Sequence, residues 1–182
     1  LAPDGGLYMP RAIPAFDWQH CLTLSAQQMS AAILSALLPD IPNMEALVKR
    51  AYTGKFETED LTPTVPVGDF QVLELFRGPT SAFKDVALSM LPQLLTAAKQ
   101  EKGIAQEIRI LTATSGDTGK AALVGFQDVP GVSICVFYPF GGVSQVQRAQ
   151  MVTQEGENVH VCAAAKSACA RGCKVAVVDR KP

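Results

Sequence analysis

The 182-residue sequence has no long hydrophobic run and almost no excess of charge of either sign. No apolar stretch approaches the roughly 18 residues that a membrane-spanning helix needs, and the start LAPDGGLYMP lacks the basic end and apolar centre of a signal peptide. Sixteen Lys and Arg residues against 17 Asp and Glu residues give a net charge of −1, which provides no electrostatic footprint for nucleic acid. We therefore expect partners that are neither nucleic acids nor membranes.

Histidine is scarce, and neither of the two histidines belongs to a catalytic pattern. His20 and His160 are isolated from any matching set of Ser, Cys and Asp, so the sequence gives no support to a hydrolase triad. Val159 and Val161 flank His160, which indicates a strand residue rather than a metal ligand.

The cysteines do not follow the spacing of a metal site. Their number is odd and their spacing irregular: Cys21, Cys135, Cys162, Cys169 and Cys173. Three residues rather than two separate Cys169 from Cys173, and no histidine follows them, which argues against zinc. We expect reduced thiols in a cytoplasmic protein.

The first part of the chain has the pattern of helices around a short strand. Apolar residues make up 48% of the sequence and charged residues 18%, as in a folded protein with a core. We predict helices at 25–38, 43–52 and from Thr80 or Ser81 to about Lys102, an extended connector at 62–68 and a strand at 70–76. Ser25 and Gln28 form a capping-box pattern, Asn43 is a favourable N-cap, Pro92 should bend or interrupt its helix, and Gly103 should end it.

From residue 107 the pattern becomes strand–helix–strand–helix–strand. The predicted elements are strands at 107–113, 132–138 and 158–163, with helices at 117–127 and 144–153. This alternation is typical of a doubly wound α/β unit with a parallel sheet and flanking helices. The nearly continuous apolar run VSICVFY predicts a strand covered on both faces.

The sequence divides into four segments by composition and pattern. We expect an N-terminal helical segment at 1–62, a segment with the candidate lysine at 63–105, a smaller α/β domain at 106–161 and an atypical tail at 162–182. The tail is rich in Ala, Cys and Lys, with a candidate strand at 175–178.

One lysine lies where a cation is unusual. Residues 78–87 (GPTSAFKDVA) put Lys84 just inside the predicted start of a helix. The partial positive charge of a helix start disfavours a cation, and so favours the neutral, nucleophilic amine that Schiff-base chemistry needs. The alternative is a solvated surface lysine with Asp85 as a charge neighbour.

A second candidate site follows the strand predicted at 107–113. In residues 114–120 (TSGDTGK) a strand turns into a helix, and Gly116 and Gly119 allow close approach of a ligand to the backbone. Hydroxyl groups and free amides there could bind a carboxylate or a phosphate at the carboxyl end of a parallel strand. The alternative is a simple N-cap of the helix, which Asp117 at its first turn would suit equally.

Two nucleotide-binding motifs are excluded at this loop. A P-loop would need glycine at position 114 and Ser or Thr at position 121, where the chain has Thr114 and Ala121. The dinucleotide pattern G-x-G-x-x-G lacks its first glycine.

Four segments, in order, resemble threonine synthase, a pyridoxal-phosphate enzyme of fold type II like the tryptophan synthase β-subunit. They are residues 1–10 (LAPDGGLYMP), 74–88 (ELFRGPTSAFKDVAL), 113–122 (ATSGDTGKAA) and 138–161 (YPFGGVSQVQRAQMVTQEGENVHV). The resemblance covers nearly nine-tenths of the chain, from its first residue to Val161. It implies the N-terminal portion of an α/β fold type II enzyme.

The resemblance also implies the chemistry. Members of the family convert O-phospho-L-homoserine and water into L-threonine and phosphate, with pyridoxal 5'-phosphate as cofactor. Lys84 matches the lysine that forms the Schiff base with the cofactor and moves protons at the substrate Cα and Cβ. Asp117 matches a position near the cofactor ring hydroxyl. The substrate-binding positions are Thr114, Ser115, Gly116, Asp117, Thr118, Gly119, Ser144 and Gln147.

The sequence departs from the family at three places. Gly142 stands where the family usually has Arg or Lys, a cation that would suit a phosphorylated substrate. The tail after Val161 does not match the family, and the family's glycine-rich loop for the cofactor phosphate lies further downstream than this sequence extends. We therefore expect an incomplete threonine synthase, with a related phospho-lyase or a non-catalytic remnant as alternatives.

Overall fold

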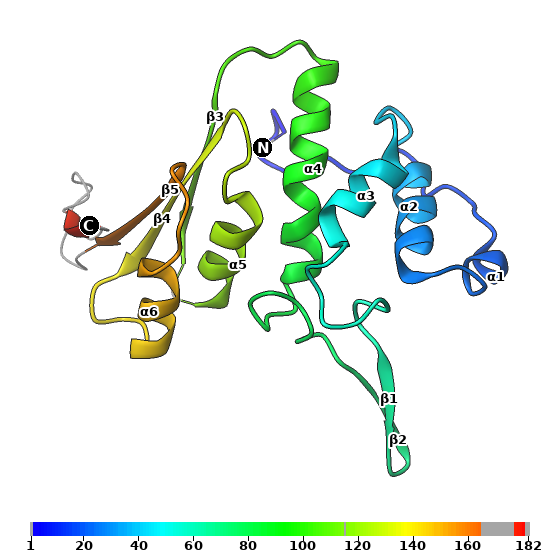
Figure 1. The fold of residues 1–182 in the computed structure, drawn as a ribbon. Helices are drawn as coiled ribbons and strands as arrows, with labels where there is room; N and C mark the ends of the chain where they lie inside the picture. The colour runs from blue at the N-terminus through cyan, green and yellow to red at the C-terminus, as the bar shows by residue number, and fades with distance from the viewer. Residues whose placement is uncertain (1, 115, 165–176, 181–182) are drawn as a thin grey trace.

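The computed structural model describes residues 2–114, 116–164 and 177–180. Helix α3 packs against the long helix α4, and α2 packs against α3, while α4 contacts the α/β unit through α5 (Figure 1). The elements are α1 (Trp18–Cys21), α2 (Ala26–Leu37), α3 (Met44–Tyr52), β1 (Thr64–Val67), β2 (Phe70–Leu73), α4 (Asp85–Glu101), β3 (Ile108–Ala113), α5 (Asp117–Phe126), β4 (Val132–Pro139), α6 (Gln145–Val152), β5 (Val159–Ala164) and β6 (Val177–Arg180). Every helix in the described ranges is too short or too polar to cross a membrane.

Helices α2, α3 and α4 share one hydrophobic core. Leu47, Val48 and Ala51 of α3 are buried against Ala31 of α2 and Met90 of α4. The predicted capping box at α2 is confirmed, since Ser25 and Gln28 exchange hydrogen bonds through side chain and backbone. The predicted side-chain cap at α3 is wrong: Asn43 adopts a left-handed backbone (φ 56°), and its side chain makes no cap bond.

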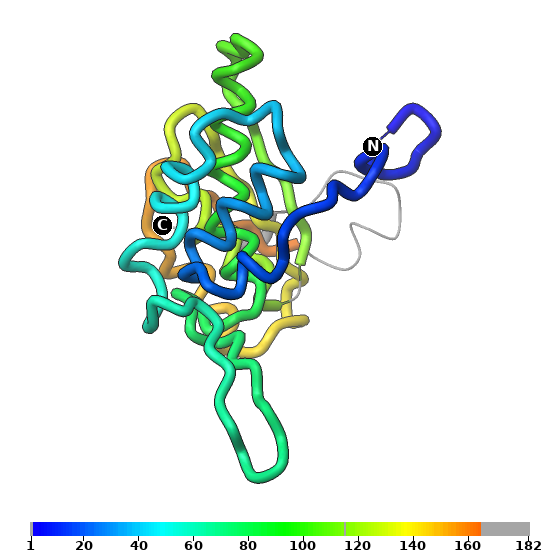
Figure 2. The backbone as a smooth tube through the Cα atoms, turned by 90° about the vertical axis from the view of Figure 1, so that its right-hand side faces the viewer, coloured from blue at the N-terminus to red at the C-terminus, as the bar shows by residue number. Residues whose placement is uncertain are grey.

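The predicted connector is part of a β-hairpin. Strands β1 and β2 pair antiparallel around a turn at Gly68, whose φ of 59° favours glycine. The expected strand at 70–76 ends at Leu73, and Pro66 belongs to β1 although proline cannot donate to a ladder. Each strand of this pair has a free edge, which tolerates the missing donor. The hairpin projects away from the rest of the chain (Figure 2).

Helix α4 begins later than predicted and continues through its proline. Its first residue is Asp85, and Pro92 lies inside it, buried. Proline at position 92 leaves the carbonyl of Leu88 without its usual helical donor. A Cβ added to Gly125 of α5 would lie 2.2 Å from that Leu88 oxygen, so the backbones of α4 and α5 touch there. Gly103 follows the helix end with a φ of 61°, as predicted.

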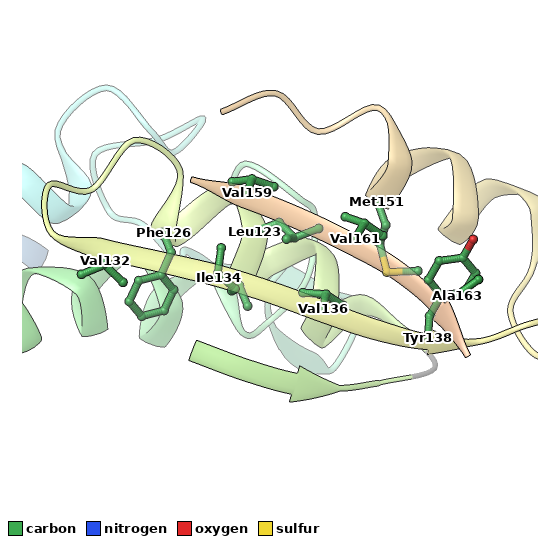
Figure 3. Close-up of a cluster of buried hydrophobic side chains, with 11 residues drawn as sticks. Leu123, Phe126, Val132, Ile134, Val136, Tyr138, Met151, Val159, Val161 and Ala163 are labelled. Atoms are coloured by element: carbon green, nitrogen blue, oxygen red, sulfur yellow. The ribbon is translucent and has the colours of Figure 1, made fainter. Parts of the chain in front are cut away.

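The α/β unit is built on a four-stranded sheet with the order β3-β4-β5-β6. Strands β3, β4 and β5 are parallel, as predicted, whereas β6 is antiparallel to β5. Strand β6 begins at Val177, two residues later than the strand predicted at 175–178. Helices α5 and α6 cover one face of the sheet. Phe126, Leu123 and Met151 from these helices pack on Ile134 and Val136 of β4 (Figure 3).

The expected cover on both faces of β4 is not seen among the described residues. Burial alternates along the strand, with Val132, Ile134, Val136 and Tyr138 buried and the residues between them half-buried. In β3 the alternate side chain of Leu111 is 72% exposed. The sheet therefore has one packed face and one open face within residues 108–164.

Candidate functional site

Helices α4, α5 and α6 begin at the same end of the molecule. Figure 1 shows the starts of α4, α5 and α6 at the end from which the β1–β2 hairpin projects. Lys84 directly precedes α4, Asp117 is the first residue of α5, and Ser144 directly precedes α6. The fold therefore brings the candidate lysine and the candidate anion loop to one end.

The amine of Lys84 makes no ion pair with a described residue. Lys84 has helical backbone angles at the N-cap position, and its residue is half-buried. Its Nζ lies 4.2 Å from the centroid of the Phe83 ring, a cation–π contact. Phe83 is itself 62% exposed, so the amine lies at the surface of the described chain and is open to a ligand.

The carboxylate of Asp85 organises the turn that carries Lys84. It accepts hydrogen bonds from the Thr80 amide at 2.8 Å, the Thr80 hydroxyl at 2.5 Å and the Ala82 amide at 3.4 Å. Asp85 is only 2% exposed. The sequence interpretation of Asp85 as a charge neighbour is therefore wrong. The expected caps are wrong too, because Thr80 donates to Asp85 and Ser81 has a left-handed φ of 56°. The spacing of Thr80 five residues before Asp85 is the sequence pattern that could have indicated this turn.

Close packing fixes the start of the same turn. A Cβ on Gly78 would lie 2.5 Å from the Cβ of Asp85, so only glycine fits there without movement. Arg77, the preceding residue, donates hydrogen bonds to Glu57 and Glu74 at 2.7 Å each. These bonds, with Glu57 the stronger contributor, raise the pKa of the Arg77 guanidinium. The turn from Arg77 to Asp85, which carries Lys84, is thus fixed by hydrogen bonds at its first and last residues.

The start of α5 is built differently, because glycine occupies its N-cap. Gly116 is extended (φ −163°) and has no side chain to cap the first amides of the helix. Its own amide donates to Thr114 Oγ1 at 3.3 Å. Gly119 packs tightly, since an added Cβ would lie 2.5 Å from Thr114 Cγ2 and 3.0 Å from Val136 Cγ1. Ser115, also a predicted site residue, lies outside the described residues.

The start of α6 adds two candidate residues to this loop. Ser144 and Gln147 form a capping box, with the Gln147 amide donating to Ser144 Oγ at 3.2 Å. The side-chain Nε2 of Gln147 also donates to Asp117 Oδ1 at 3.4 Å. The structure therefore joins Gln147 to the loop at 114–119, whereas no hydrogen bond joins Lys84 to the described residues of that loop.

The segment before α6 has no cation at position 142. A Cβ on Gly142 would lie 2.8 Å from Pro139 Cγ and 2.9 Å from Pro139 Cβ. The Gly142 amide donates to the Pro139 carbonyl at 2.9 Å in a tight turn. An arginine at this position would require the turn to move.

A large cavity among the described residues does not coincide with these helix starts. Its volume is about 1250 Å³, and residues of α4 such as Ser89 and Gln93 line it together with the segment after α5. Lys55 also lines it, and burial lowers the pKa of that amine. None of the predicted site residues borders this cavity, so the helix starts remain the better candidate site.

Comparison with known proteins connects the chain to one group. No family model matches the chain. The threonine synthase of Eremothecium gossypii is 37% identical, covering 90% of this chain and 35% of that protein. The crystal structure of yeast threonine synthase superposes with a TM-score of 0.79 at 37% identity, covering 90% of this chain and 36% of that one. The structure of PLP-bound threonine synthase from Brucella melitensis gives 0.78 at 37% identity, covering 87% and 35%.

The resemblance inferred from the sequence motifs is confirmed. The chain is similar to threonine synthases in sequence and in fold over about nine-tenths of its length, and its α/β class is as predicted. The chain spans about a third of the length of the curated relatives it matches.

Proposed function

We propose that this chain is part of a threonine synthase and contributes its lysine and its substrate-carboxylate loop. The reaction is the conversion of O-phospho-L-homoserine and water into L-threonine and phosphate, with pyridoxal 5'-phosphate as cofactor. The observation that carries the proposal is the placement of an amine without an ion-pair partner, Lys84, at the same end of the fold as the glycine-started helix α5.

The residues at this end fit the cofactor's aldehyde. Lys84 is half-buried, no described carboxylate pairs with it, and its amine lies beside the Phe83 ring. Such an amine can bond covalently to an aldehyde and can hold a proton near the substrate Cα and Cβ. Pyridoxal phosphate, when bound, supplies an electron sink that stabilises negative charge at the substrate carbon atoms. The buried turn around Asp85 would keep the amine in one place.

The loop before α5 suits the substrate carboxylate. A glycine N-cap leaves amides of the first turn for an anion, and the partial positive charge of the helix start favours it. We assign the anion site to Thr114, Ser115, Gly116, Thr118 and Gly119, with Asp117 toward the cofactor ring hydroxyl. The amides of Gly116 and Gly119 already donate to Thr114 Oγ1 and to the Gly116 carbonyl, so these glycines provide space for the anion rather than donors. Ser144 and Gln147 complete the substrate site, since Gln147 already bonds to Asp117.

Gly142 favours a second candidate function within the same class. Without a cation at this position, the substrate phosphate lacks one charge-assisted contact. A related pyridoxal-phosphate enzyme that eliminates phosphate from another phosphorylated hydroxy amino acid would fit this loop equally well. A non-catalytic remnant of the family is the remaining alternative, and the experiment below separates it from both enzymes.

The division of labour along the chain follows from this proposal. Residues 1–62 form a helical support, residues 63–105 present the lysine, and residues 106–161 form the smaller α/β domain with the substrate loop. Because the curated relatives are about three times as long, the 182-residue chain alone should bind the cofactor weakly and turn over little substrate. We expect the protein in the cytoplasm.

Borohydride reduction in the presence of pyridoxal phosphate, followed by peptide mass mapping, tests the assignment. We expect the label on Lys84, and its loss in Lys84→Arg. Lys102→Arg is the matched control, because Lys102 caps the opposite end of α4, where the helix favours a charged amine. Label spread over surface lysines, or none, would overturn the assignment and support the remnant. Threonine formation by this chain alone would contradict the expected low turnover.

A further inference from the structure

Two cysteines lie together on the open face of the sheet, away from the helix starts. Cys135 of β4 and Cys162 of β5 have their Sγ atoms 3.7 Å apart. The strands are parallel neighbours, and in their register Cys135 lies beside His160 while Cys162 lies beside Phe137. Both cysteines are half-buried. The proposed threonine synthase chemistry uses neither thiol.

Among the described residues, a cavity opens beside Cys135. A shallow cavity of about 390 Å³ on this face is lined by Arg109, Leu111, Ser133, Cys135 and His160, among others. The Leu111 side chain is 72% exposed, and His160 is exposed. Glu107, which also lines the cavity, pairs with Arg109 at 3.3 Å. A small reagent in this cavity therefore reaches Cys135, and the Cys162 sulfur lies 3.7 Å from the Cys135 sulfur.

The geometry suits one bridging atom better than a direct disulfide. A disulfide needs its sulfurs about 2.05 Å apart, whereas these lie at 3.7 Å. The two cysteines are not directly paired in the ladder, because Cys135 lies beside His160 and Cys162 lies beside Phe137. A pyramidal trivalent centre with bonds to sulfur of about 2.3 Å, at an angle of about 100°, holds its two sulfurs about 3.5 Å apart. The observed spacing is close to that value.

The number of ligands selects the kind of bridging centre. Within the described residues no group of three or more His, Cys, Asp and Glu side chains is arranged to hold a metal ion. A tetrahedral zinc site, which needs four ligands, is therefore not formed by these residues. A trivalent organoarsenic centre of the class R–As(OH)₂ has two exchangeable positions and carries its third ligand itself.

The protonation of Cys135 also matches that class. Burial, and next the hydrogen bond with Cys162, raise the pKa of the Cys135 thiol to about 11. Cys135 is therefore a neutral thiol at neutral pH and a poor nucleophile toward reagents that need a thiolate. Exchange at an As–OH bond accepts the thiol proton directly, because hydroxide leaves as water.

We propose that Cys135 and Cys162 form a two-thiol chelation site for trivalent organoarsenicals on the open face of the sheet. Each thiol forms one S–As bond and gives its proton to one arsenic hydroxyl. Two As–O bonds break, two water molecules leave, and arsenic stays trivalent, so no oxidant or reductant is needed. The product links β4 to β5 through a single atom and should raise the melting temperature of the chain.

The test uses the full chain with Cys21, Cys169 and Cys173 replaced by Ser, and phenylarsine oxide as the probe. We expect one probe per chain and protection of both remaining cysteines from alkylation after denaturation. A dithiol should release the probe, and a monothiol should not. Adding Cys135→Ser or Cys162→Ser should weaken binding at least 100-fold, because one-point attachment loses the effective concentration of the second thiol.

A second measurement keeps the proposal falsifiable if the triple variant does not fold. In the unmodified chain, peptide mapping should place the arsenical on Cys135 and Cys162, and Cys162→Ser should remove it from Cys135. The proposal would be overturned if the variants that keep only Cys135 or only Cys162 bound the probe as tightly as the variant that keeps both. An arsenical confined to Cys169 and Cys173, or ready formation of a Cys135–Cys162 disulfide with diamide before any arsenical is captured, would also overturn it.

Discussion

The starts of α4 and α5 lie at one end of the fold and neither has a side-chain cap, yet the turns that lead into them are built differently. Before α4, the buried Asp85 carboxylate accepts three hydrogen bonds from the preceding turn, and Gly78 lies in contact with its side chain. Before α5, Gly116 provides no cap, and Asp117 is exposed with one long bond to Gln147. We call the start of α4 the closed start, because its turn is fixed by its own hydrogen bonds, and the start of α5 the open start, because no side chain caps it.

This difference indicates which part of each start carries function. At α4 the preceding turn is fixed by Asp85, and the group that this turn presents is the Lys84 side chain. At α5 no side chain caps the helix, so the first-turn amides of Asp117 and Thr118 are the candidate donors. A covalent attachment point needs a fixed turn, whereas an anion site needs unused donors. The two starts have the properties that these two roles require.

Replacing Gly125 should have the largest effect, because Gly125 is where the α4 and α5 backbones touch. An added Cβ would lie 2.2 Å from the Leu88 oxygen, and a backbone oxygen cannot rotate away. We expect Gly125→Ala to lower the free energy of unfolding by about 3 kcal/mol despite the better helix propensity of alanine. Urea unfolding at constant m-value measures this.

Gly119→Ala in the same helix is the matched control. There the added Cβ meets side chains, at 2.5 Å from Thr114 Cγ2 and 3.1 Å from Met151 Sδ, and side chains can shift. We expect a loss of about 1 kcal/mol. Equal costs for both variants would mean that the backbone contact does not fix the two helices relative to each other.

Paired aspartate substitutions should separate the closed start from the open one. Asp85→Asn replaces one of the two carboxylate oxygens by an NH₂ group, which would face the N–H and O–H donors of a buried turn. We therefore expect the free energy of unfolding to fall by about 2 kcal/mol. Asp117→Asn removes only a favourable charge at an exposed helix start, for which we expect about 0.5 kcal/mol. Thermal and urea unfolding compare the two. A larger loss for Asp117→Asn would reverse the comparison.

Capping the open start should have the smallest effect and the opposite sign. Serine is a slightly better N-cap than glycine, and an added Cβ at position 116 meets only Gln147 Nε2 at 3.4 Å. We expect Gly116→Ser to stabilise the chain by a few tenths of a kcal/mol. A loss of stability, read from the urea midpoint, would show that the start is already satisfied and has no donors for an anion.

Local patterns predicted the elements well where the signal lies within a few residues. The capping box at Ser25 and the strands of the parallel sheet follow from short sequence patterns. The start of α4 could not be found in this way, because Asp85 acts on residues before it and a threonine or serine is normally the cap. The position of Lys84 beside the helix start was therefore right, but its reason was incomplete.

Features that depend on contacts between residues far apart in the sequence could not be predicted from it. Pro66 made β1 look like a connector, although a two-stranded hairpin leaves one side of each strand unpaired. Pro92 suggested a bend because the sequence does not show that Gly125 packs against the carbonyl that proline frees. The apolar run of β4 suggested two covered faces, and only the packing of α5 and α6 shows which face is buried.

The β1–β2 hairpin has a consequence for the kinetics of local opening. Its strands are almost entirely exposed, including Phe70 at 75% and Leu73 at 54%, and it packs little apolar surface of its own. Two-stranded hairpins are only marginally stable in water, so its amide protons should exchange with solvent far faster than those of β4. Slow exchange in this hairpin would therefore report directly that another surface lies against it.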